Sequence, residues 1–249
     1  MPSSLLKLWV DADEFARHTL NFTPDPVQAE ILRSTSRRIL LNCCRQWGKS
    51  TVTAALIAHR LVHGDPDTLV VAAAPALRQS AELLHKTAAF LRLCDIRPRG
   101  DGRSQTSLLL PNGARMVALP GRDATIRGFS AVSLLVFDEA ARVPDETYFA
   151  LRPMIAANSN AAIFAISTPH GQTGFFYDAW INGCSTWTRW QVTAPECPRI
   201  GPEFLEEERH NLTDIWFRQE YMCEFLQSQD CVFPADLVDA ALFGSEDMP

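Results

Sequence analysis

The residues around position 45 have the composition of a phosphate-binding loop. Gly48, Lys49 and Ser50 match the end of the pattern G-x-x-x-x-G-K-[ST], although Cys43 stands where that pattern has its first glycine. In such loops the backbone N–H groups and a helix dipole face the phosphates, the lysine reaches the β and γ oxygens, and the serine hydroxyl binds magnesium. We therefore expect a nucleoside triphosphate and Mg²⁺ to be bound here, with contacts from Cys43, Arg45, Gln46, Trp47, Gly48, Lys49, Ser50 and Thr51.

Two acidic residues follow an apolar segment further along the chain. In LLVFDEA at 134–140, Asp138 and Glu139 come directly after four apolar residues. Asp138 is suited to the magnesium shell, and Glu139 to orienting or deprotonating the attacking water. Isolated acids at such a position often cap the next helix, but the upstream phosphate loop favours nucleotide hydrolysis.

A hydroxyl pair and a glutamine extend the expected site. Ser167 and Thr168, fixed by Pro169, follow the next apolar segment, where they could sense the γ-phosphate and pass its loss to the rest of the domain. Gln28 lies in the segment FTPDPVQ, and a glutamine side chain can pair with both N6 and N7 of adenine. We therefore predict a coupling role for the first group and an adenine contact for Gln28.

Two arginines are candidates for stabilising negative charge in the transition state. Arg45 lies within the loop itself, where it could approach the γ-phosphate of its own subunit. Arg127, in the segment TIRGFSA, could reach the nucleotide of a neighbouring subunit, as an arginine finger does. The alternative for Arg127 is an ordinary surface ion pair.

Alternating strands and helices are needed to bring these residues together. Residues 1–37 are expected to form a helical lead-in, in which the prolines of FTPDP delay the helix until Gln28. The alternation predicts a mainly parallel sheet flanked by helices, with ligands at the carboxyl ends of its strands. The expected elements are the phosphate-loop strand and helix at 38–63, strands at 68–75, 132–140, 161–166 and 187–194, a hairpin at 105–119, and helices at 77–93, 145–151, 202–211 and 213–221.

The composition is that of a soluble globular protein. Hydrophobic residues make up 47% of the chain and the net charge is −6. No apolar run approaches the ~18 residues of a membrane helix, so we expect a cytoplasmic protein without a membrane contact. The seven cysteines form no CxxC pair, which favours reduced thiols over disulfides or a zinc site. The negative charge argues against a tight general DNA binder but allows a local basic patch.

Taken together, these motifs resemble the ATPase domain of the large terminase subunit, the motor that packages DNA in tailed bacteriophages. The form R-Q-x-G-K-S is the most specific piece, since terminases commonly lose the first glycine and carry an arginine in this loop. The resemblance covers residues 20–180, and its matching pieces are Phe22 to Gln28, CRQWGKS at 44–50, IRG at 126–128, LLVFDEA at 134–140 and STPHGQTG at 167–174.

The resemblance implies an α/β P-loop fold of the ASCE type (additional strand, catalytic glutamate) and ATP-driven translocation of double-stranded DNA into a procapsid. It implies partners as well: the portal protein, the small terminase subunit, and further copies of the chain in a docked ring, expected to be pentameric, with a monomer possible in solution. Such a motor works in the cytoplasm of the host, transiently on the procapsid portal, and is not part of the mature virion.

The resemblance also assigns roles to residues of this sequence. It implies that Glu139 is the catalytic carboxylate and that either Arg45 or Arg127 is the arginine finger. The remaining implied roles are phosphate and magnesium binding by Lys49 and Ser50, metal binding by Asp138, and coupling by Ser167, Thr168 and Pro169.

The expected organisation has three parts. Residues 1–37 are the lead-in, 38–200 the P-loop ATPase core, and 201–249 a helical C-terminal subdomain or linker. Terminases usually append a nuclease domain with clustered metal-binding acids, and we expect no room for such a sheet after Gly171. The acids at 206–208 are instead expected on a solvated helix face. The chain would then hydrolyse ATP without cutting DNA, either as an excised domain or as a separate motor subunit.

Two alternatives to this function stay open at the level of sequence. A superfamily 2 helicase-like ATPase shares a glutamine motif, a DE box and a serine–threonine motif, but it needs a second RecA-like domain. A catalytically silent assembly subunit would keep the fold as a scaffold. Intact Lys49, Ser50 and Glu139 argue against the silent subunit.

Overall fold

A seven-stranded sheet forms the middle layer of the protein in the computed structural model, which describes residues 11–102, 106–121, 128–183 and 185–227. The strand order is β3-β4-β2-β5-β6-β1-β7. Neighbouring strands are parallel except for the antiparallel pair β3 and β4. The strands are β1 Arg38–Cys43, β2 Leu69–Ala74, β3 Ser107–Leu109, β4 Arg115–Pro120, β5 Leu134–Asp138, β6 Ala162–Ser167 and β7 Thr188–Val192.

The predicted strands are confirmed, and burial explains why they were visible in the sequence. Every residue of β2, β5 and β6 is buried, as expected for central parallel strands that helices cover on both faces. The hairpin around Asn112 and Gly113 is also confirmed as β3 and β4. Gly113 adopts a φ of +94°, a left-handed conformation that glycine enters at little cost.

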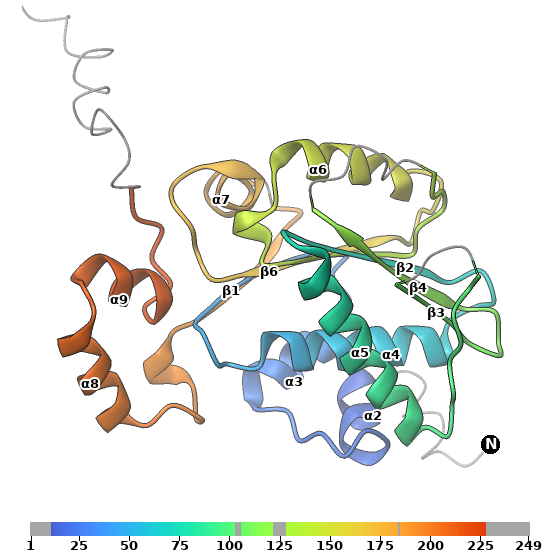
Figure 1. Cartoon of the computed structure of the whole chain (residues 1–249), viewed down its shortest axis with the longest axis horizontal. Coiled ribbons are helices and arrows are strands. Elements are labelled where there is room, and N and C mark those ends of the chain that lie inside the picture. The colour runs from blue at the N-terminus through green and yellow to red at the C-terminus, as the bar shows by residue number, and fades with distance from the viewer. Residues whose placement is uncertain (1–10, 103–105, 122–127, 184, 228–249) are drawn as a thin grey trace, which may run out of the picture.

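Helices cover both faces of the sheet. Figure 1 shows α2, α3, α4 and α5 on one face, α6 and α7 on the other, and α8 with α9 beyond the β1 edge. The predicted helices at 77–93, 145–151, 202–211 and 213–221 are confirmed to within a residue. The helices are α2 Ala12–His18, α3 Pro26–Arg33, α4 Lys49–His63, α5 Leu77–Leu93, α6 Asp145–Leu151, α7 Gly174–Ile181, α8 Pro202–Asn211 and α9 Asp214–Glu220, with short 3-10 turns η1 Ala140–Arg142, η2 Arg152–Ile155 and η3 Ala194–Glu196.

The start of α3 differs from the prediction that its prolines delay the helix until Gln28. The helix begins at Pro26, after the N-cap residue Asp25. Proline suits the first helical position because its missing N–H would have no partner there in any case. Gln28 instead occupies the third helical position, where it completes a capping box with Asp25.

The segment after β7 returns to the edge of the sheet near β1. The N–H of Ala194 bonds to the carbonyl of Tyr221, and Asn42 Nδ2 bonds to the carbonyl of Cys223. The acids at 206 and 207 are exposed, as predicted, whereas Glu208 is partly buried and accepts a hydrogen bond from the Tyr221 hydroxyl at 2.7 Å. The end of α9 is therefore part of the surroundings of β1.

Candidate nucleotide-hydrolysis site

The carboxyl ends of three adjacent strands bring the predicted motifs together. The phosphate loop follows β1, the acidic pair follows β5, and Ser167 ends β6, which lies between those two strands. In the register, Asp138 faces Ile166, and Ser167 faces Asn42. Segments that are far apart in sequence therefore meet at one edge of the sheet, as the alternation of strands and helices predicted.

The turn of the phosphate loop depends on left-handed backbone at two positions. Gln46 has a φ of 62° and Gly48 a φ of 96°. A Cβ on Gly48 would lie 3.1 Å from Gln28 Nε2, so the glycine provides both the conformation and the space. Lys49 then begins α4, and its Nζ lies 3.6 Å from Glu139 Oε1.

Two expected phosphate contacts, Cys43 and Trp47, have fully buried side chains. Burial raises the pKa of the Cys43 thiol well above its usual range, so the thiol stays protonated at neutral pH. The carbonyl of Trp47 accepts hydrogen bonds from Gln28 Nε2 and Arg199 Nη2. These two residues therefore shape the loop from beneath, and only their backbone is available to a ligand.

The acidic pair combines burial with an unusual backbone. Asp138 is 6% exposed, and burial raises its pKa to about 6, with a further upward contribution from Glu139 that Lys49 opposes. Glu139 adopts a φ of 52°, which is uncommon for a residue with a Cβ and clusters at functional sites. Its N–H donates to Asp138 Oδ1 at 3.1 Å, so the two carboxylates are held in a fixed relation.

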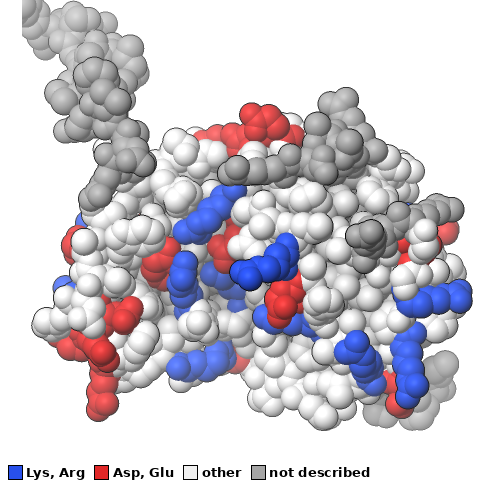
Figure 2. Space-filling model, viewed as in Figure 1, with Lys and Arg blue, Asp and Glu red and all other residues white. Residues whose placement is uncertain are grey.

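Two pockets adjoin at this edge and share Ser50, Gln79 and Glu139. Their volumes are about 390 and 460 Å³. Lys and Arg side chains gather over the middle of the face shown in Figure 2. The basic residues that line the two pockets are Arg45, Lys49, Arg78, Lys86 and Arg142.

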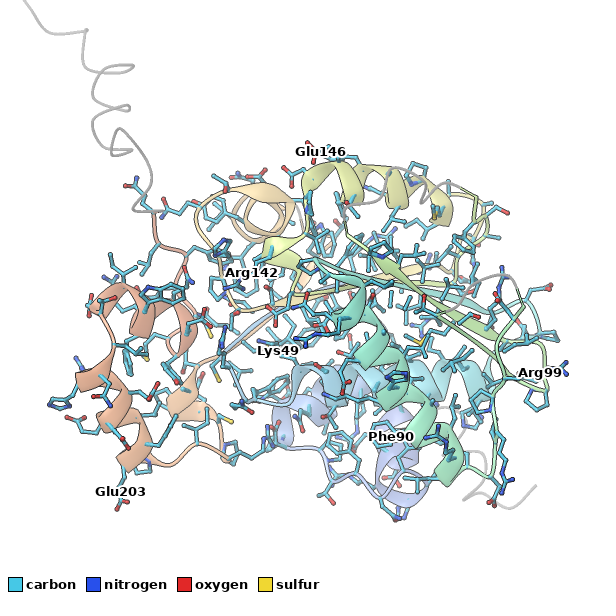
Figure 3. The ribbon with its side chains drawn as sticks, in the orientation of Figure 1. Lys49, Phe90, Arg99, Arg142, Glu146 and Glu203 are labelled. Atoms are coloured by element: carbon cyan, nitrogen blue, oxygen red, sulfur yellow. The ribbon has the colours of Figure 1, made fainter. Side chains whose placement is uncertain are left out.

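Arg142 is a site residue that the sequence reasoning missed. Its Nη1 lies 3.3 Å from Glu139 Oε2 and 3.3 Å from Thr168 Oγ1. Figure 3 shows Arg142 and Lys49 at the same edge of the sheet. The spacing of three residues from Glu139 in a helical turn was the available signal. Its third partner, Glu220 Oε1 at 3.2 Å, gave no local signal at all.

The remaining predicted residues are placed as follows. Gln28 is buried, and its amide accepts from the N–H of Asp25 and donates to the carbonyl of Trp47, each at 3.1 Å. Ser167 and Thr168 are also buried. The side chain of Arg45 is 62% exposed, with its Nε 2.6 Å from Glu220 Oε2. Arg127 lies outside the described residues.

The matching family model identifies this edge of the sheet with a known class of protein. Residues 40–239 match the model described as "Terminase large subunit, T4likevirus-type, N-terminal". The chain belongs to this terminase family. The resemblance inferred from the motifs is confirmed, and family membership favours the packaging ATPase over the helicase-like alternative.

Individual terminases agree with the family model. The terminase large subunit of Thermus virus P23-45 is 26% identical over 250 residues, which cover 86% of this chain and 51% of that protein. The chain thus spans about half the length of the curated relatives it matches.

Solved terminase structures share the fold. The large terminase ATPase domain of Thermus phage P74-26 has a TM-score of 0.76 at 22% identity, covering 86% of this chain and 98% of that one. The large terminase of another thermophilic bacteriophage, in complex with ATP-gamma-S, has a TM-score of 0.65 at 12% identity, covering 90% and 52%. These structures confirm the predicted P-loop α/β fold. Among the described helices, none has the length and apolar character needed to cross a membrane.

Proposed function

We propose that this chain is the ATP-hydrolysing motor domain of a terminase that drives double-stranded DNA into a procapsid. The observation that carries the proposal is the meeting of Lys49 Nζ and Glu139 Oε1 at 3.6 Å in a pocket edge that Ser50 and Asp138 also line. The phosphate-binding lysine, two magnesium-type oxygen ligands and a carboxylate for water activation are thus gathered in a chain of the terminase family.

Each residue has a defined role in this proposal. The backbone N–H groups around Gly48, with Lys49, bind the phosphates and stabilise the charge that develops on them. Glu139 orients the attacking water and accepts its proton. Bound Mg²⁺ would supply neutralisation of phosphate charge, and the Ser50 hydroxyl and the Asp138 carboxylate are the oxygen donors that would hold it. Burial disfavours the ionised form of Asp138, so a cation beside it would offset that cost.

Further roles belong to the same proposal. Gln28 contacts adenine from its position against the loop, Arg45 or Arg127 serves as the arginine finger, and the segment Ser167-Thr168-Pro169 couples phosphate loss to the rest of the domain. The contact between Arg142 and Thr168 supports the coupling role, because the same guanidinium reaches Glu139.

We also propose the assembly that the family suggests. The chain would act as a ring, of five copies, on the portal of a procapsid in the host cytoplasm, with the small terminase subunit and double-stranded DNA as partners. Within the chain, 1–37 is the lead-in, 38–200 the ATPase core and 201–249 a helical subdomain or linker. We propose that this chain itself does not cut DNA.

The test is phosphate release from ATP by the wild type, Lys49→Ala and Glu139→Gln, with and without double-stranded DNA. We expect slow hydrolysis that both substitutions abolish, while Glu139→Gln still binds ATP because its phosphate contacts remain. Glu146→Gln is the matched control, since Glu146 is exposed on α6, away from Lys49 (Figure 3). Hydrolysis that survives Glu139→Gln would contradict the mechanism, and a wild type that binds no ATP would support the silent assembly subunit.

A further inference from the structure

Glu220, the last residue of α9, lies beside the phosphate-binding loop although it is far from it in sequence. Its side chain is 6% exposed, and its Oε2 lies 2.6 Å from Arg45 Nε. Its backbone carbonyl also accepts a hydrogen bond from the N–H of Arg45, at 3.2 Å. The main chain and the side chain of one residue therefore both hold the loop.

Arg142 connects the same carboxylate to the reacting edge of the sheet. Its Nη2 lies 3.2 Å from Glu220 Oε1, while its Nη1 lies 3.3 Å from Glu139 Oε2. Nη1 also donates to Thr168 Oγ1 at 3.3 Å. One guanidinium thus joins α9, the acidic pair and the segment expected to couple hydrolysis to movement.

The charges make this arrangement depend on Glu220. A guanidinium is a planar, rigid fork, so fixing one of its nitrogens restricts where the others can point. Without Glu220, Arg45 and Arg142 would lose the carboxylate that lies between them, and two like charges would face each other. Arg142 would then move away from its present geometry at Glu139.

We propose that Arg142 is a positioning residue for Glu139 and that Glu220 fixes Arg142, so that the placement of α9 controls the water-activating carboxylate. This inference rests on the proposed function, in which Glu139 activates the attacking water. A displaced general base slows the chemical step, whereas the phosphate contacts of Lys49 and Ser50 are unaffected. The signature is a lower kcat with little change in the KM for ATP.

The first test is steady-state phosphate release by the full chain. We expect Glu220→Gln and Arg142→Gln each to lower kcat by about tenfold or more, with the KM for ATP within about twofold of wild type. The double variant should be no slower than the slower single variant, because both changes interrupt one chain of contacts. Arg142→Lys keeps the charge but not the fork, and should recover only part of the rate.

The control is Glu224→Gln, which makes the same chemical change a few residues along the chain. Glu224 pairs with Arg218 at 2.5 Å on the surface and touches none of the site residues named above. It should leave kcat and KM at wild-type values. Thermal melts of each variant show whether it is folded. If Glu220→Gln unfolds, Arg142→Gln carries the test, since its side chain is 26% exposed.

A second readout does not depend on turnover. Hydrogen exchange of the amides at 214–221 is measured with and without ATP-γ-S and Mg²⁺. We expect the analogue to change protection in the wild type and not in Arg142→Gln. Wild-type kcat in Glu220→Gln and Arg142→Gln, or an equal response of α9 in the variant, would overturn the positioning role while leaving the ATPase intact. A wild type that neither binds nor hydrolyses ATP would overturn the proposed function itself.

Discussion

Asp138 combines a central chemical role with an electrostatic cost. Its pKa of about 6 lies above the usual value of an aspartate, because burial disfavours the charge. The folded chain therefore binds a proton that the unfolded chain releases between pH ~4 and ~6. The folded state is stabilised by that proton at low pH and loses this stability as the pH rises through the window.

The first prediction follows from this cost. In metal-free buffer at pH 7.5, Asp138→Asn should unfold at higher urea concentration than the wild type, by an amount on the order of 2 kcal/mol, and the gain should vanish near pH 4. Urea titrations at both pH values measure it. Asp214→Asn is the control, because the Asp214 side chain is 76% exposed. A variant less stable than wild type at pH 7.5 would refute the argument.

The second prediction concerns the left-handed residue Gly48. Gly48→Ala would place a Cβ at a φ of 96°, only 3.1 Å from Gln28 Nε2. We expect a loss of roughly 1–2 kcal/mol in the free energy of unfolding and weaker ATP binding. Gly100→Ala is matched to it, since a Cβ at Gly100 meets nothing within 4 Å. Equal stability of the two variants would show that the loop tolerates the side chain.

At the scale of elements, the capping box of α3 ties a helix start to the phosphate loop. Gln28 caps the N–H of Asp25 with its oxygen and holds the carbonyl of Trp47 with its nitrogen. A residue that sequence reasoning assigned to adenine therefore also has a structural task. The two tasks are separable, because one affects folding and the other affects the choice of base.

The third prediction separates those two tasks. Gln28→Ala should lower the free energy of unfolding by about 1–2 kcal/mol, because it leaves two buried backbone groups unpaired. If Gln28 also contacts adenine, the variant should lose preference for ATP over GTP in competition binding. Gln172→Ala is the control, as Gln172 is exposed and makes its bond to the carbonyl of Phe225. An unchanged base preference would leave only the structural role.

The same scale shows what sequence could predict. Buried parallel strands are apolar throughout, so β2, β5 and β6 stand out, and their ends mark the reacting edge. The link between Arg142 and Glu220 could not be predicted, since these residues are 78 positions apart. A glutamate on a polar helix is normally solvated, and no local pattern separates buried Glu220 from exposed Glu206.

At the scale of the molecule, thiols report on global opening. Cys43, Cys44, Cys197 and Cys223 are buried, whereas Cys94 is partly exposed. Burial also raises the pKa of the Cys94 thiol to about 11, which slows but does not block its reaction.

The fourth prediction is an order of thiol labelling. In native buffer, mass spectrometry should find Cys94 modified by a thiol reagent before any of the four buried cysteines. The buried group should react at the rate of unfolding, and together in denaturant, because a closed core exposes them only when it opens. Early labelling of Cys197 or Cys223 without Cys43 would show instead that the C-terminal segment opens by itself.

The position of β1 between β6 and β7 has a consequence for the order in which the chain becomes functional during synthesis. The phosphate-binding loop leaves the ribosome early, but both neighbours of its strand and the Glu220 carbonyl that binds Arg45 come from much later sequence. Non-local pairing of this kind forms slowly. The nucleotide site is therefore encoded early and assembled last, and a nascent chain that ends before α9 has the motif without the finished loop.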